Sequence, residues 1–494
     1  MAHIRRNRIR FSGNSDNDII SNLPAEILLE ILDKLPTEDA MTTAILSPKW
    51  RNLWKILPRI ELSDNMQKER EKRVVGMVNK FIKHYEGNKM KSFHVSLKYN
   101  TRKRKTYQSW IAFAATKNVE ELHLDFHSDH RRAPPGLPPS FELPHNILNC
   151  ASLVRLHLES VGLILLPAIN LESLKELELV NSQLSDDATK VITKNCPKLE
   201  SLVLRNCNKR RNLKITVAPQ SNLSKLTIIE GYLLLSSNEI SVNAPKVTKL
   251  NFLSGMWRSK YLIENVPAVT EARLSFDDMQ FKVTKGIFYG EGTEKKLDGL
   301  LENFQQAKVL HLCSKAITSM INPGKEFTST QYFVSDVKYL TVRDMTNRRN
   351  LLFNCHRLSL DTGMQRRELP GIAFLLKACP RLETLVIVIT KGQSEFRFAD
   401  DLAANGIFVG GKYWKTKHNA FKSCLQRLAA VEFVNLWGTY QTWDARKFDP
   451  KKFFRACQDG YDLLIFLMEN SPSFERFIFT TSKKQEEFPK LLFL

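Results

Sequence analysis

The densest grouping of possible metal ligands in the sequence lies between residues 123 and 130. It contains three histidines and two aspartates: His123, Asp125, His127, Asp129 and His130. Such side chains bind zinc when they converge on one point and are held there by further hydrogen bonds. On a strand, His123 and Asp125 would share a face, while His127 and His130 would enter the following loop. We therefore expect a loop with solvated histidines, and neither a metal site nor a cofactor.

Catalytic motifs are missing from the rest of the sequence. It contains no GxSxG nucleophile motif and no HExxH zinc motif, and no glycine-rich stretch has the spacing of a phosphate-binding loop. Eight cysteines occur without any CxxC pair, so neither a zinc site nor a disulfide framework is indicated. The chain is predicted to act by binding other molecules and not as an enzyme.

Residues 18–62 predict three short helices separated by proline. The first helix carries a row of apolar residues at four-residue spacing: Leu23, Ile27, Ile31 and Leu35. Residues at this spacing form one helix face. A segment of about 45 residues has only a marginal core of its own. We therefore expect a partner surface to cover its remaining apolar side chains.

Prolines and hydroxyl residues predict where the second and third helices begin. Pro36-Thr37 should end the first helix and cap the second with the Thr37 hydroxyl. Ser47-Pro48 should start the third helix in the same way. This helix carries large apolar residues three and four positions apart, which places them on one face: Trp50, Leu53 and Trp54.

The order LPAEILLEILDKLP, then a small-residue helix, then LSPKWRNLW, closely resembles the F-box. In that family the segment docks on a Skp-type adaptor, and through it joins the cullin and RING subunits of a ubiquitin ligase. The resemblance implies an adaptor-binding surface made by the prolines and large apolar residues of this segment: Leu23, Pro24, Ile27, Ile31, Leu35, Pro36, Leu46, Trp50, Leu53 and Trp54.

The body of the chain repeats one phrase, apolar-x-x-apolar-x-apolar. It occurs as VEELHL (119–124), LVRLHL (153–158), LKELEL (174–179), LESLVL (199–204), LSKLTI (223–228), VTKLNF (247–252), VTEARL (269–274), AKVLHL (307–312), VKYLTV (337–342), CHRLSL (355–360) and LETLVI (382–387). Successive phrases begin 34, 21, 25, 24, 24 and 22 residues apart, close to the roughly 20–29-residue period of leucine-rich repeats. Later steps of 38, 30 and 18 residues indicate inserted helices or loops.

The phrase has a physical explanation. Its last three positions should form a short strand whose apolar residues point inward, and stacked units then share one core. An ordinary α/β sheet is the weaker alternative, because several steps are too short for a strand, a helix and two loops. The region resembles plant F-box proteins with leucine-rich repeats. We predict an α/β fold, with a three-helix F-box followed by a curved parallel-sheet solenoid.

The outward residues of these strands should line the concave side of the solenoid. Early repeats offer mainly acidic residues and histidines, and later ones mainly basic residues. The candidate target-binding residues are Glu121, His123, His157, Glu178, Arg205, Lys225, Lys249, Arg273 and Tyr339. Our hypothesis is that this charge gradient orients a bound target protein. The alternative is a solvated surface without a binding role.

The last hundred residues predict a further unit. LQRLAAVEFVNLWG (425–438) alternates like a strand, and YDLLIFLMENSPSFERFIFT (461–480) reads as helix, proline break and strand. This order resembles the FBD domain, and it would cap the open end of the solenoid. The predicted domains are a flexible basic tail (1–17), the F-box (18–62), a connecting helix and first strand (63–115), the solenoid (116–390) and the FBD-like cap (391–494).

Composition bounds the location and the partners. The 494 residues are 43% hydrophobic with no apolar run long enough to span a bilayer, and cysteine usage predicts a reducing compartment, the nucleus or cytoplasm. The net charge of +21 could attract nucleic acid or an inositol polyphosphate. The charge is spread along the chain, which favours solvated surface. The open alternatives are a scaffold without ubiquitin transfer, a hormone-type receptor and a nucleic-acid-binding protein.

Overall fold

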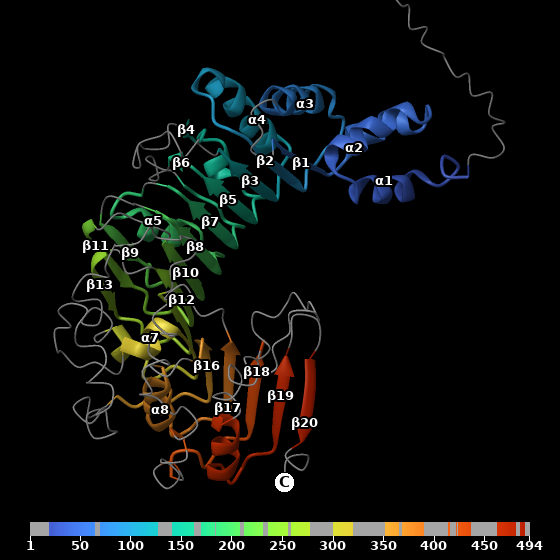
Figure 1. Ribbon diagram of the computed structural model, residues 1–494. Helices are drawn as coiled ribbons and strands as arrows, with labels where there is room; N and C mark the ends of the chain where they lie inside the picture. The colour runs from blue at the N-terminus through green and yellow to red at the C-terminus, as the bar shows by residue number, and fades with distance from the viewer. Residues whose placement is uncertain are drawn as a thin grey trace, which may run out of the picture. The chain divides into compact units, whose positions relative to one another are not determined.

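The computed structural model describes residues 19–64, 70–126, 141–162, 169–182, 184–207, 212–230, 236–254, 258–276, 300–319, 351–364, 368–389, 413–414, 421, 423–435, 462–480 and 485–489. These residues belong to two compact units. Unit 1 comprises Met1–Gln183 with Asn195–Lys198, and unit 2 comprises Leu184–Lys194 with Leu199–Leu494. Figure 1 shows the elements of both units.

Unit 1 begins with short helices, as the proline spacing predicts. They are α1 (Ala25–Asp33), α2 (Thr37–Thr42) and two 3-10 helices, η2 (Thr43–Ile45) and η3 (Trp50–Ile56). The side chains of Leu28 and Leu32 form the buried face of α1. The predicted row with four-residue spacing is not this buried face: Ile27 is exposed, and Leu23, Ile31 and Leu35 are half-buried. The third predicted helix corresponds to η3, which is a 3-10 helix.

The predicted hydroxyl caps are wrong. Residue Pro36 is the N-cap of α2 and Lys49 is the N-cap of η3, and neither helix has a side-chain cap. The Thr37 hydroxyl instead accepts a hydrogen bond from the backbone N–H of Glu61 at 2.8 Å. Because Thr37 is buried against the first strand, its oxygen satisfies that strand and not the helix end.

Two longer helices connect the short helices to the strands of unit 1. They are α3 (Arg70–His84) and α4 (Arg104–Thr116), the latter preceded by the 3-10 helix η4 (Thr101–Lys103). The connecting helix predicted within residues 63–115 is α3, and it buries Val74, Val78 and Phe81. The Trp110 indole N–H of α4 donates a hydrogen bond to Asn79 Oδ1 of α3 at 2.7 Å.

Five parallel strands form the main sheet of unit 1. In sheet order they are β1 (Arg59–Ser63), β2 (Ser92–Ser96), β3 (Glu121–Asp125), β5 (Arg155–Glu159) and β7 (Glu176–Val180). Smaller elements accompany them: the paired strands β4 (Phe141–Glu142) and β6 (Val161–Gly162), and the 3-10 helix η5 (Ile147–Asn149). Leu122, Leu156 and Leu177 stand in one register row, at most 3% exposed. Such rows form the shared core of the repeats.

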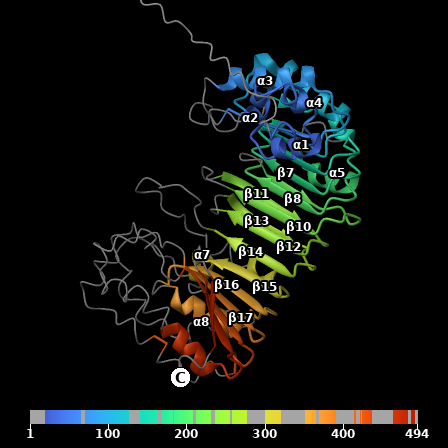
Figure 2. The same ribbon diagram turned by 90° about the vertical axis from the view of Figure 1, so that its right-hand side faces the viewer.

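Unit 2 continues the same pattern with more strands. Its main strands, parallel to one another in sheet order, are β8 (Ser201–Arg205), β10 (Lys225–Glu230), β12 (Lys249–Ser254), β14 (Glu271–Ser275), β15 (Val309–Cys313), β16 (Arg357–Thr362), β17 (Thr384–Ile389), β18 (Ala430–Val434) and β19 (Arg476–Thr480). β20 (Gln485–Pro489) pairs antiparallel with β19. Figure 2 shows β10, β12 and β14 side by side.

The return segments of unit 2 are of two kinds. Three of them form a second parallel sheet: β9 (Leu213–Thr216), β11 (Ser236–Asn243) and β13 (Arg258–Glu264). Others are helical: α5 (Ala188–Asn195), α7 (Ser314–Ser319), α8 (Leu369–Ala378) and a helix over 462–470. Only the last residue of α5, Asn195, belongs to unit 1. The strand returns explain the short repeat steps, since an extended segment needs fewer residues than a helix and two loops.

Ten of the eleven repeated phrases become main strands, and every one begins at the third residue of its phrase. The eleventh phrase, at 337–342, lies outside the described residues. The predicted α/β fold, a helical N-terminal segment followed by parallel-sheet repeats, is confirmed. In the C-terminal region β18 and β19 continue the parallel sheet. The domain boundaries and the FBD-like character of residues 391–494 stay predictions.

The chain turns sharply where several main strands end. The residue directly after the strand has positive φ at Ser160 (57°), Asn181 (51°), Asn206 (54°) and Asn435 (55°). Asparagine tolerates this left-handed region better than most residues. At three of these corners the backbone N–H donates to a carbonyl of the next strand, for example from Asn206 to Ile229 at 2.7 Å. The corner residues thus join neighbouring repeats.

Two predictions from composition can be compared with the described part of the chain. Six cysteines are buried there, as expected of small core residues: Cys150, Cys196, Cys207, Cys313, Cys355 and Cys379. Across the same residues, the helices are all too short or too polar to cross a bilayer.

Candidate interaction surfaces

The N-terminal helices expose an unusual amount of apolar surface. Among the described residues, seven large hydrophobic side chains are exposed, and six of them lie between residues 19 and 56. These six are Ile19 (77%), Ile20 (59%), Ile27 (41%), Ile45 (87%), Leu46 (64%) and Ile56 (40%). Single exposed apolar residues are common, but a concentration in one short segment indicates an interaction site.

The predicted adaptor-binding residues divide by exposure. Four are exposed: Pro24, Ile27, Pro36 and Leu46. Three are half-buried: Leu23, Ile31 and Leu35. Three are buried: Trp50, Leu53 and Trp54, at 4–8% exposure. Ile19, Ile20, Ile45 and Ile56 are exposed as well but do not belong to the predicted set. The one signal in the sequence is their large apolar side chains within or directly before the motif, which does not reveal exposure.

The buried tryptophans hold the segment together from inside. The Trp50 indole N–H donates a hydrogen bond to Ser21 Oγ at 3.1 Å, and that oxygen lies 3.1 Å from Ser47 Oγ. The Trp54 ring packs against Phe81 of α3, with ring centroids 6.2 Å apart. These contacts fix the residues before α1 and join η3 to α3. In the chain alone, the tryptophans therefore support the exposed apolar side chains rather than form the surface.

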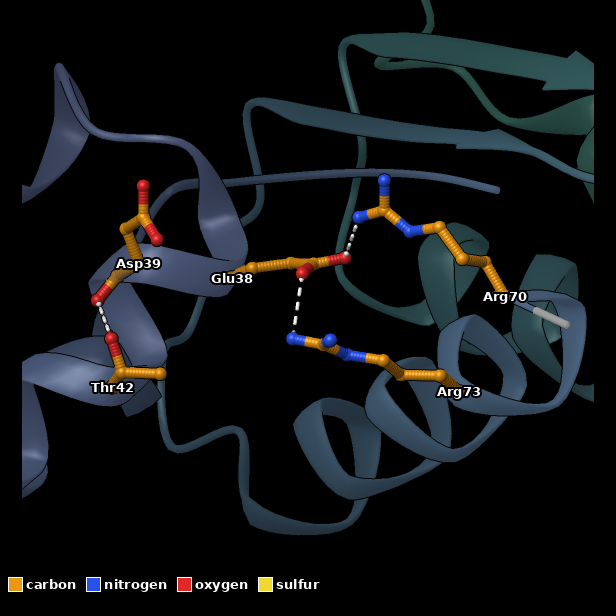
Figure 3. A network of polar contacts seen from close by, with 5 residues as sticks. All are labelled: Glu38, Asp39, Thr42, Arg70 and Arg73. Carbon is orange, nitrogen blue, oxygen red and sulfur yellow. Dashed lines mark hydrogen bonds and ion pairs between the residues drawn. The ribbon is translucent and has the colours of Figure 1, made fainter. Parts of the chain in front are cut away.

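A polar network also joins α2 to α3 (Figure 3). The carboxylate of Glu38 lies between two guanidinium groups, with Oε1 3.1 Å from Arg70 Nη2 and Oε2 3.0 Å from Arg73 Nη2. Glu38 is only 19% exposed, so this double ion pair is screened less than a surface pair. The network fixes how the short helices sit on the helix that leads into the repeats.

The main sheet of unit 1 carries a row of three histidines on its outward face. In register across five neighbouring strands stand Glu61, His94, His123, His157 and Glu178. We call these five residues the histidine row. The rings of His123 and His157 stack at 3.9 Å with an interplanar angle of 5°, and those of His94 and His123 are 5.3 Å apart. His157 Nδ1 lies 3.0 Å from a carboxylate oxygen of Glu178.

Partial burial keeps two of these rings neutral. The pKa of His123 is lowered to about 4, chiefly by burial and then by the neighbouring His157 and His94. The facing carboxylates Asp125 and Glu178 raise this pKa by a smaller amount. The pKa of His94 is also lowered, chiefly by burial. Both rings are therefore uncharged at neutral pH.

Two further outward rows flank the histidine row in unit 1. One contains Arg59, Ser92, Glu121, Arg155 and Glu176. The other contains Ser63, Ser96, Asp125, Glu159 and Val180. The Arg155 guanidinium pairs with Glu121, and the Ser96 hydroxyl donates to Asp125 at 2.6 Å. The structure thus brings the predicted residues Glu121, His123, His157 and Glu178 onto one face.

The predicted basic residues lie on the corresponding face of unit 2. Lys225 and Lys249 are register neighbours, and Lys249 pairs with Glu271 at 2.8 Å. The guanidinium of Arg273 lies 3.6 Å from Asp361. Arg205 ends strand β8 on the same face. Carboxylates therefore neutralise part of the predicted positive charge. Tyr339 lies outside the described residues.

The histidine and aspartate cluster considered as a metal site is only partly described. His127, Asp129 and His130 lie outside the described residues, while His123 and Asp125 share the outward face of β3. Within the described ranges, no three histidine, cysteine or acidic side chains converge in the way a metal ion requires.

Comparison with known proteins places these features in a family. The F-box domain matches residues 20–62. The family described as FBD-associated F-box protein At5g56370, LRR repeats, matches residues 107–269. The first match contains α1, α2, η2 and η3, and the second contains the main strands from β3 to β12.

Individual relatives agree with the family matches, and all three cited below are from Arabidopsis thaliana. F-box/LRR-repeat protein At3g26922 is 30% identical over 266 residues, which are 53% of this chain and 84% of the relative. F-box/LRR-repeat protein 25 is 32% identical over 201 residues, covering 40% of this chain and 72% of the relative. F-box/FBD/LRR-repeat protein At1g78750 is 29% identical over 280 residues, covering 54% of this chain and 58% of the relative. With a helical F-box followed by parallel leucine-rich repeats, the chain belongs to the plant F-box/FBD/LRR-repeat protein family.

Proposed function

We propose that this chain is the target-recognition subunit of a ubiquitin ligase of the Skp–cullin–F-box type. The observation that carries the proposal is the concentration of exposed isoleucine and leucine side chains on the F-box. A Skp-type adaptor would cover them and connect the chain to cullin and RING subunits. The repeats would bind a target protein. This arrangement is that of an intracellular, non-catalytic subunit, which raises the local concentration of target beside the transferring enzyme.

The exposed side chains define the adaptor-binding surface most sharply at η2. Ile45 is 87% exposed and Leu46 is 64% exposed. Burying a fully exposed side chain of this size contributes about 1.5–3 kcal/mol. In proportion to their exposure, the two residues together should contribute about 3 kcal/mol to adaptor binding, or about a hundredfold in Kd. Neither side chain is buried within the chain, so replacing them should spare the fold.

The direct test measures adaptor binding by the full chain and by Ile45→Ser/Leu46→Ser. The matched control is Leu352→Ser, which removes a 60% exposed leucine from unit 2. We expect binding to weaken about a hundredfold in the F-box variant and to stay unchanged in the control. Equal binding by all three proteins, with unchanged circular dichroism, would reject the assigned surface. Trp50→Ala is a poorer test because this residue is buried and its loss would disturb the fold.

The alternative is a scaffold that binds the adaptor without ubiquitin transfer. Comparing ubiquitinated interactors of the wild-type chain and of Ile45→Ser/Leu46→Ser separates the two functions. A ligase subunit should lose ubiquitination of its interactors while still capturing them through the repeats. A scaffold should show the same ubiquitination pattern with either protein.

A further inference from the structure

The outward face of unit 1 is acidic although the chain as a whole is basic. Within its five main strands, the outward positions carry six carboxylates: Glu61, Glu121, Asp125, Glu159, Glu176 and Glu178. The same positions carry two cations, Arg59 and Arg155. The formal charge of these eight side chains is minus four, against a formal charge of +21 for the whole chain. A locally reversed charge of this size attracts cations and repels phosphates.

Both cations of this face contact carboxylates. Arg59 Nε lies 2.8 Å from Asp33 of α1, and Arg155 pairs with Glu121 of the neighbouring strand. Neither guanidinium is therefore placed to attract an anionic ligand. The excess negative charge lies at both ends of the histidine row, at Glu61 and Glu178, and along one side of it, at Asp125 and Glu159. The row on the other side is balanced, with two carboxylates and two guanidinium groups.

The histidine row has a definite length. Neighbouring strands of a sheet are about 4.8 Å apart, so the four steps from Glu61 to Glu178 cover about 19 Å. An extended peptide advances about 3.3 Å per residue, so six residues cover about 20 Å. Between the two carboxylates the row offers three flat imidazole rings, two of which stack face to face.

We propose that this face of unit 1 binds an extended basic segment of the target protein, an inference that rests on the proposed function. Cationic side chains about six residues apart would lie over Glu61 and Glu178, and the residues between them would cross the histidine rings. Glu61 is exposed, and the Glu178 side chain is 31% exposed, so both carboxylates are accessible to a peptide. Charge complementarity of this kind sets the register and specificity of a complex.

The test uses synthetic peptides and the full chain. The probe is a fluorescent peptide with two arginine pairs separated by five neutral residues. One comparison peptide has a single residue between the pairs, and another has glutamates in place of the arginines. Fluorescence anisotropy at physiological salt should show at least tenfold tighter binding of the probe than of either comparison peptide. Equal binding of the two arginine peptides would overturn the proposed register.

Paired variants locate the site on the chain. Glu61→Gln/Glu178→Gln removes the two carboxylates at the ends of the row with little change of shape. The matched control, Glu172→Gln/Asp186→Asn, removes the same charge from exposed turn positions. We expect the first variant to lose at least tenfold in probe affinity and the control to lose less than twofold. Equal losses in both variants would show non-specific attraction and overturn the proposal.

The same variants separate this proposal from the proposed function. Glu61→Gln/Glu178→Gln should bind the Skp-type adaptor as tightly as the wild type, since neither residue belongs to the exposed apolar surface. Failure of the peptide experiments with intact adaptor binding would overturn only the basic-segment proposal. Failure of the wild-type chain to bind the adaptor would overturn the proposed function, and with it the proposal that the basic segment belongs to a ubiquitination target.

Discussion

Acid should destabilise the repeats of unit 1 through the histidine row. The pKa of His123 is lowered to about 4, mainly by burial and then by His157 and His94. The ordinary histidine value is near 6.5, so the unfolded chain binds more protons than the folded chain between those two values. Stability is therefore full above about pH 6.5 and is lost as the pH falls toward 4.

The size of the effect follows from this shift. Between pH 7.5 and pH 5, a histidine with a folded pKa near 4 would cost at most about 2 kcal/mol of stability. The His123 ring is half-buried, so solvent screens its interactions and a cost of about 1 kcal/mol is more realistic. The pKa of His94 is lowered too, and it acts in the same direction. Charged neighbours facing these rings, Glu61 and Glu178 among them, oppose the effect only in part.

Hydrogen exchange with mass spectrometry measures this locally. The opening free energy of the β2 and β3 amides is compared at pH 7.5 and pH 5, after correcting for the pH dependence of intrinsic exchange. His123→Gln should reduce the difference between the two pH values by about 1 kcal/mol. Any loss of ring stacking is common to both conditions and cancels. The control Asn251→Gln changes an outward side chain of unit 2 that does not titrate. An undiminished pH difference in His123→Gln would refute the reasoning.

Two further predictions concern single contacts. Glu38→Gln should weaken the ion pairs to Arg70 and Arg73 and lower the stability of the junction between α2 and α3 by about 1 kcal/mol. Limited proteolysis between α2 and α3 should therefore be faster in this variant. The control Asp39→Asn, on the same helix, should leave the cleavage rate unchanged. Asn435 has φ 55°, a left-handed conformation that glycine adopts more easily than alanine. Asn435→Ala should therefore be about 1 kcal/mol less stable than Asn435→Gly. Equal urea midpoints of the two variants would contradict a left-handed corner.

The sequence predicts the strands well because each repeat carries the same local pattern. In VEELHL and LVRLHL, apolar residues two positions apart determine which side chains point inward, and a strand forms wherever neighbouring repeats supply a partner. The chain length between phrases also limits what can return from one strand to the next. Strand positions and inward faces therefore follow from short stretches of sequence.

Other features depend on contacts that no local pattern specifies. Thr37 has the right residue type and position for a helix cap, yet its hydroxyl satisfies the N–H of Glu61 in β1. The F-box motif shows which residues are large and apolar, but not that Trp50 and Trp54 are buried while Ile45 is 87% exposed. Exposure is decided by packing against α3 and against residues before α1, which are distant in sequence or outside the motif.

The histidine row shows how both levels combine. Its members His123, His157 and Glu178 each occupy the fifth position of their phrase, and the same position in unit 2 supplies the register row Val203, Thr227, Asn251, Arg273 and His311. Because parallel strands pair in register, residues more than twenty positions apart become neighbours about 4.8 Å apart. The residues at the fifth position of successive phrases thus form one outward row in each unit. The unit 1 row ends in the carboxylates Glu61 and Glu178, whereas the unit 2 row contains the cation Arg273 beside Asp361, so the same position of the phrase carries different charges in the two units.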